Sequence, residues 1–169
     1  MQTEAFRLAP HDWVPNHPRL PVLLYHEAID DLGDDAASTF ETRFDDNGWP
    51  PQWRAGIYDF HHYHSSAHEV LGVAKGTVQL VLGGPGGREV RVGAGDVVLL
   101  PAGTGHCSIE SSDDLLVVGA YPPGQKWDVC REAPTQEMVD RIAQLPFPAC
   151  DPVSGEHGPM LACWNLSSS

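Results

Sequence analysis

The chain has few basic residues, and it contains no long apolar run. Its 169 residues include 10 Lys and Arg against 23 Asp and Glu, which gives a net charge of −13. Nucleic acids and anionic membranes bind basic surfaces, so we expect neither as a partner. No segment approaches the ~20 apolar residues of a membrane span. The N-terminus also lacks an apolar core of signal-peptide length, and we therefore expect a cytoplasmic protein.

Cysteine is scarce, and its spacing excludes several kinds of site. The four cysteines contain no C-x-x-C pair, and a chain of this length does not need disulfides to fold. We expect them to be reduced thiols. The sequence also shows no Ser-His-Asp arrangement, no phosphate-binding loop and no dinucleotide fingerprint.

Histidines cluster in the middle of the chain. His62 and His64 are one residue apart, Glu69 follows five residues later, and His106 comes just after a Pro-Ala-Gly turn. We predict a strand over 58–64, on which His62 and His64 project from the same face. Three imidazoles and one carboxylate are a ligand set for a divalent transition metal. From composition alone, a solvated polar face without a metal stays open as the alternative.

These residues fall within two motifs that resemble those of the cupin superfamily, with one departure, Glu110 in place of the usual Asn. The first motif, G-x5-H-x-H-x4-E-x6-G, is matched at Gly56, His62, His64, Glu69 and Gly76. The second, G-x5-P-x-G-x2-H-x3-N, is matched at Gly95, Pro101, Gly103 and His106.

The resemblance continues into the flanks, which include PNHPRLPVLLY, YPPGQKWDVCRE and DPVSGEHGPMLACW. There the chain is similar to the YjlB-like subgroup of small RmlC-like cupins. It implies an all-β fold, the cupin double-stranded β-helix or jelly-roll barrel, with an irregular N-terminal arm and a short C-terminal helix. We expect one domain over 1–169, with the barrel core at about 54–121, the arm at 1–53 and the helix and tail at 122–169. Six to eight short β-runs separated by Gly-rich turns agree with this fold.

Outside the barrel, local patterns predict the other elements. A helix is expected over 34–47, because Phe40 and Phe44 are spaced to share one face. A second helix should begin after a Thr135 cap and end at Leu145. We expect a strand at 21–25, a loop at 47–53 and an edge strand at 161–164.

The resemblance implies that His62, His64, Glu69 and His106 hold one divalent transition metal ion. Fe, Mn, Ni, Zn, Co and Cu all accept mixed N and O ligands, so the sequence does not choose among them. The neighbouring His61 and His68 are expected to point away, although the turn before His68 can reset the alternation of faces.

Strand alternation also predicts the lining of a pocket for a small molecule. That pocket should be apolar and aromatic, with few polar groups. Glu110 is open to three interpretations: an acceptor for a ligand histidine, a general base, or a solvent-facing charge. No catalytic residue can be assigned. The predicted lining residues are Tyr58, Phe60, Leu71, Ser108 and Glu110.

The leading functional hypothesis is a metal-dependent enzyme acting on a small organic molecule, of the oxygenase, isomerase or decarboxylase type. The alternatives are a non-catalytic binding or sensor cupin, and a structural cupin with an incidental metal. We also expect a homodimer, because jelly-roll sheets leave edges that association can cover.

Overall fold

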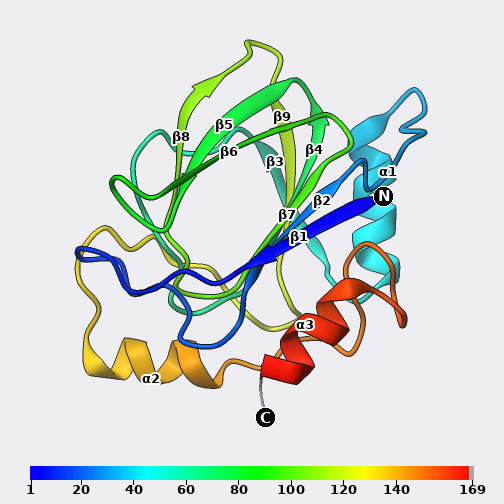
Figure 1. Cartoon of the computed structure of the whole chain (residues 1–169). Helices are drawn as coiled ribbons and strands as arrows, with labels where there is room; N and C mark the ends of the chain where they lie inside the picture. Colours follow the sequence, from blue (N-terminus) through cyan, green and yellow to red (C-terminus); the bar gives the residue numbers. More distant parts are fainter. Residues whose placement is uncertain (168–169) are drawn as a thin grey trace.

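Two antiparallel sheets make up the body of the protein. The computed structural model describes residues 1–167. One sheet has six strands in the order β1-β2-β7-β4-β9-β3, and the other has three in the order β6-β5-β8. They curve around a common interior and form a jelly-roll barrel (Figure 1). The strands are β1 (Gln2–Phe6), β2 (Val22–His26), β3 (Pro51–Ala55), β4 (Glu69–Lys75), β5 (Thr77–Leu82), β6 (Arg88–Gly93), β7 (Val97–Leu100), β8 (His106–Ser111) and β9 (Leu116–Ala120).

The interior of the barrel is apolar because alternate residues of each strand point inward. In the described residues it forms one buried cluster that draws on both sheets. Burying such side chains contributes about 1.5–3 kcal/mol each relative to exposure. The cluster consists of Val22, Leu24, Leu71, Val73, Val78, Leu80, Leu82, Val92, Val98, Leu100 and Val117.

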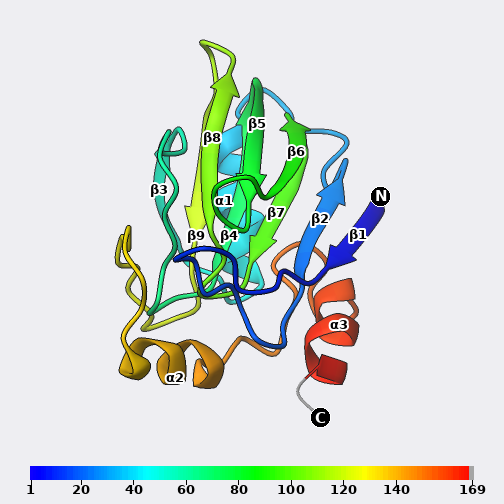
Figure 2. The same ribbon diagram turned by 60° about the vertical axis from the view of Figure 1, so that its left-hand side comes forward.

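Two helices cover the outer face of the six-stranded sheet. α1 (Ala36–Asp46) is capped at its N-terminus by Asp35, whose carboxylate accepts the backbone N–H of Ser38. The helix predicted over 34–47 is confirmed. Its Phe40 packs on β4 where residue 72 is glycine; a Cβ there would lie 2.7 Å from the Phe40 ring. On the same face α3 (Pro159–Ser167) buries Trp164 completely (Figure 2).

α3 overturns the prediction of an edge strand at 161–164. Pro159 occupies the first helical position, where its missing N–H costs nothing. The buried Asp151 carboxylate then accepts the backbone N–H of Met160 at 2.9 Å. A run of four apolar residues does not distinguish a buried helix from a strand.

α2 (Gln136–Gln144) agrees with prediction and lies at one end of the barrel (Figure 1). The Thr135 hydroxyl accepts the Met138 N–H and caps the helix. Ile142 is its buried residue. Within residues 1–167, none of the three helices is both long and apolar enough to cross a membrane.

The first 55 residues contain more strand than predicted. The strand expected at 21–25 is present as β2, and β1 pairs with it antiparallel, from Gln2 opposite His26 to Phe6 opposite Val22. The loop predicted at 47–53 ends early, because β3 begins at Pro51 and pairs with β9. The described residues therefore contain nine strands, against the six to eight predicted.

Candidate metal site

His62 and His106 are brought together by their backbones. The His62 N–H donates to the His106 carbonyl at 3.2 Å, and the His106 N–H donates back at 2.9 Å. Tyr63 pairs on its other side with Cys130 in the same way, at 3.0 and 2.9 Å. The segment thus crosses between β8 and a later loop, and the continuous strand predicted over 58–64 is wrong. His62 and His64 nonetheless turn toward the same point, while the fully buried Tyr63 packs beside Trp13.

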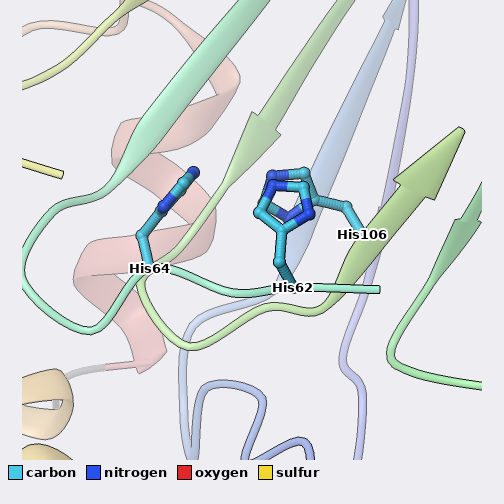
Figure 3. A group of neighbouring side chains, drawn as sticks. All are labelled: His62, His64 and His106. Carbon is cyan, nitrogen blue, oxygen red and sulfur yellow. The ribbon is translucent and has the colours of Figure 1, made fainter. Parts of the chain in front are cut away.

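Three imidazoles converge at this point (Figure 3). One ligand nitrogen from each of His62, His64 and His106 lies within 4.8 Å of the other two. All three residues are at most 5% exposed. Burial, the largest effect, and the neighbouring His106 together lower the pKa of His62 to about 3, so His62 is a neutral nitrogen donor.

The hydrogen bonds of the three rings fix which nitrogen is available. A backbone carbonyl only accepts, so each Nδ1 must carry a hydrogen, and in the neutral ring Nε2 then carries the lone pair. Backbone acceptors of this kind orient histidine ligands in metal sites. The acceptors are Phe60 O for His62 at 3.0 Å, Thr104 O for His106 at 3.0 Å, and Asp128 O for His64.

Glu69, the first residue of β4, supplies a buried carboxylate beside them. Its Oε1 lies 3.2 Å from His106 Nε2, and its Oε2 lies 3.3 Å from His64 Nε2. Burial by itself raises the pKa of Glu69, but the two imidazoles override that effect and hold it well below the ordinary value. Burial likewise lowers the pKa of His64, yet Glu69 outweighs it and the pKa is raised.

These contacts place lone pairs of nitrogen and oxygen against one another. Two Nε2 atoms that lack hydrogen cannot donate to a carboxylate, so the arrangement needs a cation between them. A proton on His64 supplies a positive charge between His64 and Glu69 only. A divalent metal supplies it for His64, His106 and Glu69 together. The donor set therefore fits a divalent transition metal.

Tyr121, just after β9, also holds Glu69. Its hydroxyl donates to Glu69 Oε2 at 2.5 Å and accepts the Trp53 indole N–H at 2.8 Å. Burial raises the pKa of Tyr121, and the charge of Glu69 raises it further, so the phenol keeps its proton and donates it. Neither Tyr121 nor Trp53 was predicted from the sequence. No local signal marks them, because they meet only through the pairing of β3 with β9. That pairing sets Trp53 opposite Gly119, where a Cβ would lie 2.1 Å from the indole.

A cavity of about 240 Å³ opens above these groups. Of the predicted pocket residues, Tyr58 and Leu71 line it. Phe60 lies behind Tyr58 and stacks on its ring at 4.8 Å. The complete lining is Trp53, Ala55, Gly56, Ile57, Tyr58, His62, His64, Glu69, Leu71, His106, Tyr121 and Trp127.

Ser108 and Glu110 do not line the cavity, and they lie on different faces of β8. Ser108 pairs with the inward-facing Leu80, whereas Glu110 pairs with Gln79 and is exposed. One residue of β8, Ile109, lies between Ser108 and Glu110, whereas none lies between their partners on β5, so Ile109 forms a β-bulge. The bulge resets the alternation that predicted a shared face for Glu110, Ser108 and His106.

Sequence comparison agrees with this geometry. The family model for the cupin domain matches residues 50–118. The chain is also 36% identical over 165 residues to the uncharacterized protein YjlB of Bacillus subtilis (strain 168). The alignment covers 96% of this chain and 97% of that protein. The chain belongs to the cupin family.

Two solved structures resemble this cupin distantly. A DUF861 family protein of Thermotoga maritima (tm1112) is 20% identical, with a TM-score of 0.30 over 42% of this chain and 75% of the other. Streptomyces albus HEPD, solved with Fe(II) and 2-hydroxyethylphosphonate, is 12% identical, with a TM-score of 0.29 over 86% of this chain and 28% of that one. At these scores neither likeness bears on the site.

His61 and His68 of this cupin lie outside the three-histidine cluster. The His68 ring is fully buried on the far side of β4, 5.1 Å from the Trp164 ring. Its Nδ1 accepts the Ala102 N–H at 2.9 Å. His68 is therefore part of the packing between the sheet and α3.

The support of His64 extends outward to α2. The Asp128 carbonyl that orients His64 belongs to a residue whose carboxylate accepts both the N–H and the hydroxyl of Ser65. Arg141 of α2 in turn donates to the Ser65 carbonyl at 3.1 Å and to its hydroxyl at 2.5 Å. The orientation of a metal-site histidine thus depends on contacts with the C-terminal part of the chain.

Proposed function

We propose that this cupin binds one divalent transition metal ion through His62, His64, Glu69 and His106, and that it is a metal-dependent enzyme acting on a small organic molecule. Oxygenation, isomerisation and decarboxylation are the reaction types considered. One observation carries the proposal. Three Nε2 lone pairs and one buried carboxylate meet at the floor of a cavity whose rim residues, Tyr58 and Trp127, are exposed.

A metal in such a site polarises a substrate oxygen or lowers the pKa of bound water. Three neutral imidazoles and one carboxylate leave a dication with a local charge of about +1. Tyr121 keeps Glu69 oriented toward the histidines, and the apolar walls exclude water from most of the cavity. Such exclusion strengthens the electrostatic interactions within the cavity.

A second candidate is a non-catalytic binding or sensor protein, and the lining of the cavity is the observation that favours it. Among the described residues that line the cavity, Glu69 is the one carboxylate, and no Lys is present. A general acid or base separate from the metal ligands is therefore missing from the described walls, apart from the tyrosine hydroxyls.

The first test is the metal content of purified protein and of matched variants. We expect His62→Ala, His64→Ala and His106→Ala to lose most bound metal, and Glu69→Gln to bind it more weakly. His61→Ala is the control, because it removes an adjacent imidazole that lies outside the cluster. Full metal in His62→Ala, or none in His61→Ala, contradicts the proposed ligand set.

The second test separates the enzyme from the binder. Metal-loaded protein is mixed with candidate substrates while oxygen uptake and product formation are followed. Turnover that depends on His106 supports the enzyme. A ligand that binds tightly and is recovered unchanged supports the binding protein.

A further inference from the structure

The walls of the cavity are almost entirely aromatic or aliphatic. Above the metal-site floor they consist mainly of Trp53, Ile57, Tyr58, Leu71, Tyr121 and Trp127. The polar atoms of two of these rings are already engaged, because the Trp53 N–H donates to the Tyr121 hydroxyl and that hydroxyl donates to Glu69. These two side chains therefore offer a ligand ring surface rather than hydrogen-bond donors.

The walls above the proposed metal site lack a counter-ion for an anionic substituent. Among the described lining residues there is no Lys or Arg. Arg131 lies nearby, but its guanidinium stacks over Phe60 at 3.9 Å, behind the wall. Arg54 is held by Glu41 at 2.6 Å. A carboxylate or phosphate placed against these walls would lose water without gaining a charged partner.

The shape of the walls favours a flat molecule. Trp127 is stacked on Tyr121, with ring centroids 4.8 Å apart and planes 8° from parallel. Tyr58 is backed by Phe60 at 4.8 Å and 18°. An apolar cavity of about 150 Å³ holds benzene, so about 240 Å³ accommodates one substituted ring.

We propose that the cavity binds an uncharged molecule with one aromatic ring and an oxygen substituent directed at the metal. The inference rests on the proposed metal site for its floor and on the aromatic walls for its selectivity. Trp127 and Tyr121 contact the ring, while the absence of a wall cation excludes a second, anionic substituent.

The test uses the full chain loaded with Co²⁺ under argon, with metal content measured before any probe is added. The probes are phenol, 4-hydroxybenzoate and cyclohexanol, followed by calorimetry and by the Co²⁺ absorption spectrum. We expect phenol to bind and to change the spectrum. 4-Hydroxybenzoate with its phenol oxygen at the metal places a carboxylate against the walls without a charged partner, so it should bind at least about 10-fold more weakly. Cyclohexanol, which lacks the aromatic face, should bind about 2- to 12-fold more weakly.

Trp127→Leu tests the wall directly. Trp127 is 40% exposed, so the substitution leaves the core intact. We expect full Co²⁺ loading with a loss of about 2- to 12-fold in phenol affinity. Trp13→Leu is the matched control, because Trp13 lines a different groove, and its affinity should be unchanged.

The outcomes separate the two proposals. Wild-type protein that takes up no Co²⁺ refutes the metal-site proposal and this inference with it. Loaded protein that binds 4-hydroxybenzoate or cyclohexanol as tightly as phenol refutes the inference alone. So does loaded Trp127→Leu protein with unchanged phenol affinity.

Discussion

Replacing Tyr121 by Phe removes one oxygen atom from the support of Glu69. The aromatic ring stays, and with it the stacking on Trp127. The buried carboxylate loses its 2.5 Å donor, and the Trp53 N–H loses its acceptor. We expect the metal-free protein to be destabilised, because Glu69 is ionised and depends on this bond in the absence of a metal.

The size of the effect follows from the two lost bonds. A hydrogen bond to a charged group contributes about 1.5–3 kcal/mol, and an orphaned donor that is only partly buried adds up to about 1 kcal/mol. A loss near 3 kcal/mol, at about 3 °C per kcal/mol for a domain of this size, lowers the melting temperature by about 9 °C. The loss should be smaller in the metal-loaded protein, because a bound cation compensates the charge of Glu69.

The assay is thermal unfolding of metal-free and metal-loaded protein, followed by circular dichroism. Tyr58→Phe is the control, since it removes a hydroxyl from a half-exposed tyrosine that lines the same cavity. Surface changes of that kind stay within about 0.5 kcal/mol. Equal melting temperatures for the two metal-free variants would show that the Tyr121 hydroxyl does not stabilise Glu69.

Other predictions concern more distant features. Burial, the largest effect, and the neighbouring His68 lower the pKa of His17 to about 3, whereas an unfolded imidazole titrates near 6.5. The free energy of unfolding should therefore fall as pH drops from 6.5 toward 3. In denaturant unfolding of metal-free protein, His17→Asn should reduce this pH dependence by up to about 1.4 kcal/mol per pH unit. An unchanged pH dependence would contradict the prediction. Ser65→Ala removes a contact that holds Asp128 against His64, so metal affinity should fall roughly 10-fold in a chelator competition assay, and full affinity would refute that link. The homodimer stays a prediction, which light scattering at micromolar concentration tests: β1 is an edge strand that a second subunit can cover, and a monomeric mass would exclude it.

Local signals predicted the elements that local interactions determine. The paired phenylalanines located α1, and Thr135 located α2. β3 was missed because Pro50-Pro51 reads as a loop, although Pro is tolerated as the first residue of an edge strand. α3 was missed because its apolar run has no clear period and is fixed by burial of Trp164.

The candidate ligands could be identified from motif spacing, whereas their surroundings could not. Trp53 reaches Tyr121 only because β3 pairs with β9 in a register that sets it opposite Gly119. That pairing joins segments more than 60 residues apart, and no short-range pattern encodes it. The bulge at Ile109 likewise depends on how β8 pairs with β5, so sequence parity misplaced Glu110.

The bond between His64 and the Asp128 carbonyl spans 64 residues of chain. A ribosome adds about 5–20 residues per second, so the acceptor is synthesised roughly 3–13 s after the ring that it orients. His106 also precedes Asp128, and all four proposed ligands are therefore synthesised before this support. A metal ion captured on the growing chain would meet a His64 ring still free to rotate, and tight binding would await completion of the C-terminal segment.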